Sequence, residues 1–233
     1  MPFRLLKNRT MEKHIMNITF DALCAQIEKE MKNKRPLVLA IDGNSASGKT
    51  TLAAQLAERF RGDVIHMDDF FLPLHLRTPE RLNEPGGNVH YERFLEQIIQ
   101  PLTAHKAQTA APLTDAASPF LLIWQRFDCA AGGFSPNLCH SGNAPLLIIE
   151  GAYSMRPEFR TAYDLTLFLS ADLETQKERI LLRNGQQKLT AFLEKWIPME
   201  NRYFAHYRIA EKCRLQASAE NFFSENSPIN KSE

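Results

Sequence analysis

Two kinds of hydrophobic pattern alternate along the chain. Short, mainly apolar runs lie at 37–41, 146–149 and 165–169, and such runs are typical of strands buried on both faces of a sheet. Between them, apolar residues recur every three or four positions, as at 20–33 and 50–60, which is the spacing of a helix that packs one face on a core. This alternation predicts an α/β fold in which helices cover both faces of a parallel sheet.

Two further segments have weaker patterns. Residues 72–90 contain Pro, Gly and Arg without a clear period, which predicts a long loop. Residues 120–134 begin with a mainly apolar run and reach Gly-Gly near their end, which favours a strand or hairpin arm that runs into a turn.

Helix ends are predicted from proline and glycine. We expect a helix from residue 91 to stop at Pro101, and a helix over 188–207 to be broken or kinked near Pro198, because proline has no N–H to donate. Gly185 is expected to close the helix that begins after Asp172, since glycine readily adopts the left-handed backbone of a helix C-terminus.

Composition and charge limit the classes of protein. The 233 residues are 44% apolar and 24% charged, with a formal net charge of +1, so neither a nucleic-acid nor a membrane partner is indicated. The four cysteines show no C-x-x-C spacing, which favours free thiols in the cytoplasm. We expect a flexible extension at 1–16, a single domain over 17–222 and a polar tail at 223–233.

A glycine-rich loop carries the strongest chemical signal. Residues 43–50 fit the pattern G-x-x-x-x-G-K-[ST] between a predicted strand and a predicted helix, the context of a loop whose N–H groups surround nucleotide phosphates. Lys49 would reach the β- and γ-phosphates, and the Thr50 hydroxyl would bind Mg2+. The predicted nucleotide-binding residues are Gly43, Asn44, Ser45, Ala46, Ser47, Gly48, Lys49, Thr50 and Thr51.

Acidic residues follow two other predicted strands. Asp68 and Asp69 come after the strand that begins at Asp63, and Glu150 ends the strand at 146–149. In parallel sheets ligands bind at the carboxyl ends of strands, so we expect these carboxylates near the phosphate loop. Glu150 and Asp69 are candidate partners of Mg2+ with Thr50, and either aspartate could act as a base.

The remaining motifs point to a kinase of small molecules. The chain lacks the N-K-x-D and D-x-x-G motifs of GTPases and the signature of ABC-type ATPases. The segments GNSASGKTT, HMDDFFLP, LLIIEGAYS and ERILLRNG resemble the uridine kinase/phosphoribulokinase group of phosphate-loop kinases, over roughly residues 36–214. The resemblance implies phosphorylation of a hydroxyl by ATP, or another nucleoside triphosphate, with Mg2+. It makes Asp68 the base and places Arg179 and Arg183 in a lid over the phosphates.

The acceptor is the less defined part of the prediction. Uridine or cytidine is the first choice, with pantothenate, a sugar or another small alcohol as alternatives, and a regulatory or assembly ATPase without an acceptor as the rival class. The lid segment is shorter than usual, and His90 stands where uridine kinases often carry an aspartate. Oligomeric state is left open, with a homo-oligomer included. The expected substrate-binding residues are Phe71, Arg77, His90, Tyr91, Arg93, Phe127 and Asp128.

Overall fold

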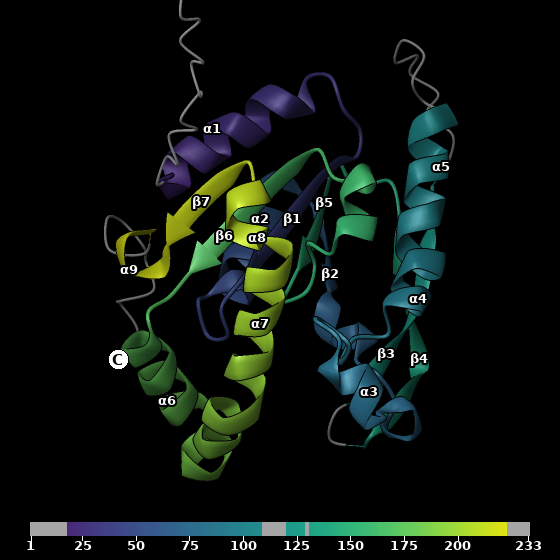
Figure 1. Cartoon of the computed structure of the whole chain (residues 1–233). Coiled ribbons are helices and arrows are strands. Elements are labelled where there is room, and N and C mark those ends of the chain that lie inside the picture. Colours follow the sequence, from purple (N-terminus) through teal and green to yellow (C-terminus); the bar gives the residue numbers. More distant parts are fainter. Residues whose placement is uncertain (1–17, 109–119, 129–130, 223–233) are drawn as a thin grey trace, which may run out of the picture.

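A five-stranded parallel sheet forms the centre of the molecule (Figure 1). The computed structural model describes residues 18–108, 120–128 and 131–222; the expected extension at 1–16 and tail at 223–233 lie outside these ranges. The strands follow the order β2-β5-β1-β6-β7, and every neighbouring pair is parallel. Their bounds are β1 Leu37–Gly43, β2 Asp63–His66, β5 Leu146–Glu150, β6 Leu165–Ser170 and β7 Leu215–Ser218.

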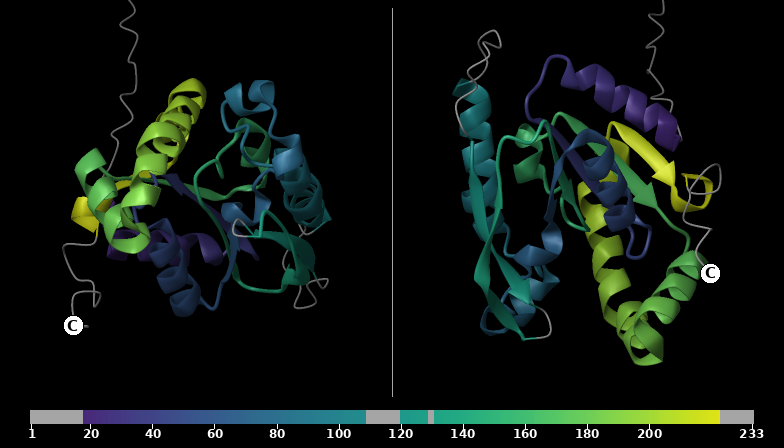
Figure 2. Two further views of the ribbon diagram at one scale, coloured as in Figure 1. Left: turned by 90° about the horizontal axis from the view of Figure 1, so that it is seen from below. Right: turned by 180° about the vertical axis from the view of Figure 1, so that it is seen from behind.

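Helices cover both faces of the sheet, as the alternation of patterns predicts. All seven residues of β1 are buried. Leu37, Leu39 and Ile41 pack with α1 (Phe20–Met31) and α2 (Lys49–Phe60), while Val38 and Ala40 join the core on the opposite face. The two further views show α1 and α2 on one side of the sheet and α7 (Ile197–Tyr207) with α8 (Ile209–Lys212) on the other (Figure 2). The unbroken apolar run of β1 thus reflects burial from two sides.

The two prolines do not end their helices. The helix α4 (Tyr91–Phe94) continues through the π-helical turn η3 (Leu95–Ile99) into α5 (Gln100–Gln108), and therefore passes Pro101. The same arrangement recurs where the π-helical turn η5 (Phe192–Trp196) precedes α7 and Pro198. A π-turn changes the hydrogen-bond register of a helix, so the wider turn before each proline accommodates its missing N–H. The predicted stop at Pro101 is wrong for this reason.

The helix α6 (Leu173–Ala191) is interrupted where the sequence predicts its end. Gly185 has φ 76° and ψ 172°, after which the helix resumes. The segment formed by α6, η5 and α7 descends from the sheet and returns to it as a V-shaped pair of helices (Figure 1). We call residues 173–207 the helical arm.

An antiparallel hairpin stands beside the sheet, formed by β3 (Leu122–Asp128) and β4 (Gly133–Ser141). It packs against the 3-10 turn η1 (Met67–Phe70) and against η3. This confirms the hairpin and its Gly-Gly turn.

The segment at 72–90 is more regular than the sequence predicts. It contains the 3-10 turn η2 (Leu74–Leu76) and the short helix α3 (Pro79–Asn83). Arg81 braces it by donating to the carbonyl oxygens of Gly87 at 3.0 Å and Val89 at 3.1 Å. Short elements (η4, Pro157–Ala162; α9, Ala219–Phe222) complete the described chain. None of the helices in the described ranges has the length and apolar character needed to cross a bilayer.

Candidate active site

The loop between β1 and α2 leads into the N-terminus of a helix and lines a cavity. Gly48 has φ 98° and precedes the first residue of α2. The first N–H groups of a helix have no acceptor inside that helix, and together with the helix dipole they attract anions. The ammonium of Lys49 lies across its own loop and donates to the carbonyl oxygens of Gly43 at 2.9 Å and Asn44 at 2.7 Å. The loop therefore has the donors that a polyphosphate requires.

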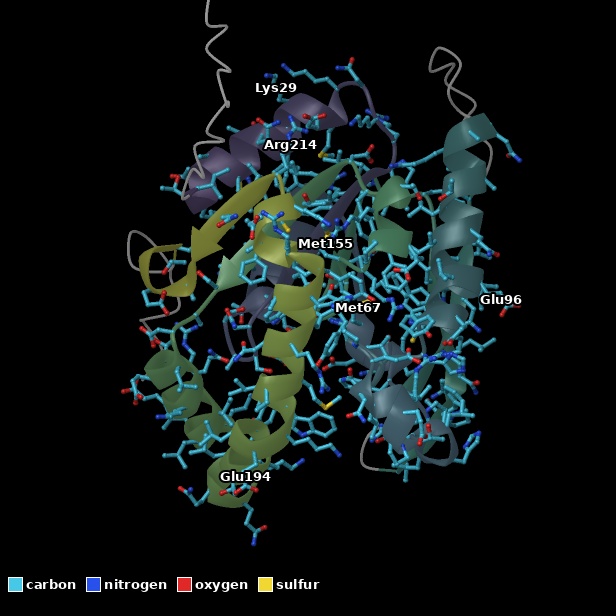
Figure 3. All side chains as sticks on the ribbon, in the orientation of Figure 1. Lys29, Met67, Glu96, Met155, Glu194 and Arg214 are labelled. Carbon is cyan, nitrogen blue, oxygen red and sulfur yellow. The ribbon has the colours of Figure 1, made fainter. Side chains whose placement is uncertain are left out.

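A buried aspartate holds the start of the loop. Asp42 accepts hydrogen bonds from the Gly43 N–H at 2.8 Å, the Met155 N–H at 3.0 Å and the Tyr203 hydroxyl at 2.8 Å. Its side chain is fully buried, and this burial raises the pKa of Asp42 to about 6. The hydrogen bonds from Tyr203 and Gly43 and the charge of Lys49 act in the opposite direction and lower the pKa. Asp42 thus connects the loop to α7 and to the segment after β5. Met155, labelled in Figure 3, marks this central position.

Glu150 lies beside the loop because of strand register. The register of the parallel sheet pairs Glu150 with Ile41 on β1 and with His66 on β2. Its Oε1 accepts from the Thr50 hydroxyl at 3.1 Å and lies 2.6 Å from the His66 Nδ1. The hydrogen bond with Glu150 is the main cause that raises the pKa of His66. Thr50 and Glu150, both predicted to contact Mg2+, are therefore together.

The two aspartates after β2 point to different places. They lie on the 3-10 turn η1, in which successive side chains are about 120° apart. Asp68 extends into the cavity, where surrounding protein limits its hydration; this, together with the nearby Glu150 charge, raises the pKa of Asp68, while Lys49 lowers it. Asp69 is buried and accepts from the Trp124 Nε1 at 2.8 Å and the Arg126 Nε at 3.0 Å.

The position of Asp69 changes its expected role. Both of its carboxylate oxygens are engaged by the hairpin strand β3, and it does not line the cavity that Asp68 lines. The sequence placed Asp69 among the Mg2+ ligands because it could not show which of two adjacent aspartates faces the loop. In the structure Asp69 joins η1 to β3, a structural role.

One cavity of about 900 Å³ contains most of the predicted site. It is open at the carboxyl edge of the sheet, and its wall is formed by the phosphate loop, η1, the segment after β5 and the helical arm. Among its lining residues are Ser45, Ala46, Gly48, Lys49, Thr50, Thr51, Asp68, Phe71, Arg77, Phe127, Glu150, Arg179 and Arg183.

Four of the seven predicted substrate residues lie elsewhere. The ring of Tyr91 is placed between the guanidinium groups of Arg81 and Arg156, at 3.8 and 3.7 Å from its centroid. His90 caps α4 by accepting from the Arg93 N–H at 3.3 Å. Arg93 is buried and donates to the Gln125 carbonyl at 2.6 Å and to the Asp69 carbonyl. Asp128, at the end of β3, accepts from the Ala131 N–H at 3.1 Å.

Packing accounts for the positions of Tyr91 and Arg93 outside the cavity. Arg81 of the segment at 72–90 donates to the Tyr91 hydroxyl at 2.8 Å, and the Gln125 carbonyl of β3 accepts from Arg93 at 2.6 Å, so both side chains make contacts between elements rather than line the cavity. Phe71, Arg77 and Phe127 line the cavity, and their contact with an acceptor stays a prediction. Arg77 donates through Nε to the Leu72 carbonyl at 2.7 Å, and its guanidinium lies 5.8 Å from the Phe127 ring centroid.

The helical arm contributes residues that sequence reasoning missed. Glu200 accepts from the Ser45 N–H at 2.9 Å and from the Ser45 hydroxyl at 2.5 Å. Lys188 and Trp196 also line the cavity, whereas the other tryptophan, Trp124, is buried in the core. No motif marks Glu200 or Lys188, since their approach to the loop depends on how the arm returns to the sheet.

Two further residues that line the cavity come from the segment at 72–90 and from the segment after β5. Asn88 and Tyr153 are buried, and both face the same cavity. A hydrogen bond from Asn88 opposes the burial that raises the pKa of Tyr153. Tyr153 has φ 76°, an unusual backbone conformation for a residue with a side chain. Residues held in this way are frequent at ligand sites.

The donor set fits a nucleoside triphosphate with Mg2+. The N-terminus of α2, Lys49 and Arg179 supply positive partners for phosphate oxygens, and the oxygen atoms of Thr50 and Glu150 are of the kind that Mg2+ prefers. Arg179 already contacts the loop, donating to the Ala46 carbonyl at 3.1 Å.

Comparison with known proteins bears on the fold and the class of protein. No family model matches the chain. A uridine kinase of Bacillus licheniformis is 26% identical over 184 residues, which cover 73% of this chain and 81% of that protein. A tRNA dimethylallyltransferase of Prochlorococcus marinus is 35% identical over 86 residues, or 36% of this chain. The chain spans less than a third of the length of such transferases, since the match covers 29% of that protein.

Solved structures share the fold over most of the chain. A candidate uridine kinase from Bacillus stearothermophilus has a TM-score of 0.60 at 23% identity, covering 85% of this chain and 96% of that one. YFH7 of Saccharomyces cerevisiae, a candidate P-loop kinase, has a TM-score of 0.61 at 11% identity and covers 85% and 97%. The α/β phosphate-loop fold is confirmed, and so is the resemblance to the uridine kinase-like group.

Proposed function

We propose that the chain is an ATP-dependent kinase of a small molecule, which transfers the γ-phosphoryl group to a hydroxyl, with uridine or cytidine as the first-choice acceptor. One observation carries the proposal: Lys49 and Asp68 line the same cavity, and Thr50 and Glu150 lie beside them. Phosphoryl transfer to an alcohol requires groups that bind the phosphates, here the loop with Lys49, and a carboxylate such as that of Asp68 in the same cavity.

Each residue has a defined task in this proposal. Bound ATP with Mg2+ supplies the phosphoryl group and the cation that offsets its charge. Lys49 leaves the carbonyl oxygens of its loop and neutralises charge on the phosphate oxygens. Asp68 accepts a hydrogen bond from the acceptor hydroxyl, orients it and takes its proton late in the transfer. Its raised pKa makes it a better proton acceptor than an aspartate whose pKa has the ordinary value.

The acceptor side has both aromatic and polar partners. Phe71 and Phe127 offer ring faces or edges for a flat group, and Arg77 offers donors for a carbonyl or an anionic group. A pyrimidine nucleoside has the matching features, and the relatives that cover most of the chain include uridine kinases. Pantothenate or a sugar also presents a hydroxyl and oxygen acceptors, and these remain the alternative acceptors.

An acceptor screen tests the proposal. The protein is incubated with radiolabelled ATP and Mg2+ and separately with nucleosides, pantothenate, sugars and sugar phosphates, with Lys49→Ala as the inactive control. We expect transfer to one class of alcohol, with uridine or cytidine first. Steady release of phosphate that is independent of every acceptor would support the rival, an ATPase with a regulatory or assembly role.

A further inference from the structure

A carboxylate of the helical arm occupies the phosphate loop. Glu200 is only 5% exposed, and its two carboxylate oxygens each accept one hydrogen bond from Ser45, at 2.9 Å from the N–H and 2.5 Å from the hydroxyl. Ser45 is the third residue of the loop and lines the cavity, as does Glu200. Glu200 thus binds the loop as a bidentate anion.

The contact places a negative charge where another anion is expected. Successive N–H groups of such a loop are directed at phosphate oxygens. The Ser45 N–H is engaged by Glu200, while Lys49 is folded onto the carbonyl oxygens of its own loop. Burial raises the pKa of Glu200, and the charge of Asp68 adds to this effect, whereas Lys49 and the bonds from Ser45 lower it. A phosphate at Ser45 would face this carboxylate at close range.

The helical arm is anchored to the core close to Glu200. Tyr203, three residues later, is fully buried and donates to Asp42 beneath the loop at 2.8 Å. Further from the sheet the arm is interrupted at Gly185 and reaches its tip near Glu194, which is labelled in Figure 3. Glu200 and Arg179 are the two arm side chains that bond to residues of the loop within the described structure.

We propose that Glu200 is an internal ligand of the phosphate loop, which a nucleotide must displace through its terminal phosphates. This inference rests on the proposed function in one respect, namely that the loop binds a nucleoside triphosphate. Displacement costs binding energy that grows with the phosphate charge near Ser45, so it lowers affinity for ATP and leaves AMP unaffected. Displacement also breaks the contact between the arm and the loop at Ser45. Because Lys188 and Arg183 line the cavity from the same arm, nucleotide binding is thereby coupled to their positions.

A purely structural role for Glu200 makes the opposite prediction. If the Ser45 contact shaped the loop for phosphate binding, removal of the carboxylate would weaken ATP binding, because the donors would lose their orientation. If Glu200 competes with phosphate, removal of its charge strengthens ATP binding. The sign of one affinity change therefore separates the two roles.

The experiment measures nucleotide affinity without catalysis. Isothermal titration with ATP, ADP and AMP in EDTA is carried out on the wild-type protein, Glu200→Gln and the control Glu194→Gln, which removes an exposed charge from the same arm. We expect Glu200→Gln to bind ATP about tenfold more tightly or better, since removal of a close like charge is worth at least this factor. AMP affinity should stay within about twofold, and the control should match the wild type.

The outcomes separate this inference from the proposed function. Equal or weaker ATP binding by Glu200→Gln would overturn the inference while leaving a nucleotide-binding enzyme. If neither protein bound ATP, the proposed function would fail and the inference with it. Should Glu200→Gln fold poorly, Ser45→Ala provides the second variant: it removes the 2.5 Å bond but keeps the backbone donor. It should raise ATP affinity by a smaller factor, and a decrease would contradict the inference.

A spectroscopic readout checks the movement of the arm. The chain has two tryptophans, of which Trp124 is buried and Trp196 lines the cavity on the arm. In a Trp124→Phe background, ATP should change the Trp196 emission, and AMP should change it much less. The same emission change in Glu200→Gln before any nucleotide is added would show that release of Glu200 moves the arm; an unchanged emission would argue against this coupling.

Discussion

The hydroxyl of Thr50 donates to Glu150 across 3.1 Å, although the two residues are 100 positions apart in the chain. The contact exists because β1 and β5 are parallel neighbours, so that the loop after one strand and the last residue of the other meet at the same sheet edge. Asp68 reaches this edge from β2, the neighbour of β5 on its other side. Three distant segments thus bring a phosphate grip, a candidate Mg2+ partner and a candidate base into one cavity.

Lys49→Ala should lower turnover by a factor of about a hundred or more for every acceptor. The ammonium is the loop's own cation, held by the Gly43 and Asn44 carbonyls until phosphate is present. The measurement is kcat with the acceptor found in the screen, with thermal unfolding as a control of the fold. Wild-type turnover in a folded variant would exclude the loop as the reaction centre.

Asp68→Asn should reduce kcat by about 10² to 10⁴ and change the Kd for ATP little. The carboxylate faces the cavity from η1, whereas the loop binds the nucleotide from β1 and α2. Single-turnover rates and nucleotide titrations on the same preparation separate the two effects. A large loss of ATP affinity with an unchanged chemical rate would assign Asp68 to nucleotide binding instead.

Asp69→Asn is expected to act on stability. One amide oxygen cannot replace both carboxylate oxygens, which accept from Trp124 and Arg126, and a lost charged hydrogen bond at a buried group costs about 1–3 kcal/mol. Urea unfolding should show this loss. Added Mg2+ should not restore activity that is lost; recovery at high Mg2+ would return Asp69 to the metal site.

The buried carboxyl of Asp42 should make stability depend on pH. Its pKa is raised from 3.8 to about 6 in the folded protein, so between these values the folded state holds more protons than the unfolded chain. Stability from this group is therefore present at low pH and decreases as pH rises through this interval, by about 3 kcal/mol at most. Because Asp42→Asn cannot titrate, the difference in unfolding free energy between wild type and variant should change from pH 4 to pH 7. Parallel pH profiles for the two proteins would contradict the assignment.

Gly185→Ala should destabilise the helical arm. Gly185 adopts φ 76° and ψ 172°, a conformation that only glycine populates well and that costs another residue about 1–3 kcal/mol. No neighbouring atom lies within 4 Å of the position where a Cβ would be, so the cost is conformational rather than steric. Gly133→Ala, which is equally open but has no positive φ, is the matched control. Equal melting temperatures for the two variants would mean that the arm simply straightens.

The sequence by itself determined the fold class and the position of the phosphate loop between a strand and a helix. The apolar runs of β1 and β5 and the helical spacing of α2 are local patterns, and burial on two sides leaves a clear signal in them. The phosphate loop is also local, because its function depends on consecutive backbone N–H groups between a strand and a helix. Lys49, Thr50 and Glu150 accordingly lie together at one cavity, and their roles toward ATP and Mg2+ stay predictions.

Only the tertiary structure decided which neighbouring residues face the cavity. Asp68 and Asp69 are chemically alike, and the choice between them depends on Trp124 and Arg126, which approach from β3 more than fifty positions later. Tyr91 does not line the cavity, because its ring packs against the guanidinium groups of Arg81 and Arg156. Glu200 reaches Ser45 from 155 positions away. Such contacts depend on how distant elements pack, and packing is set by the whole core rather than by any one segment of sequence.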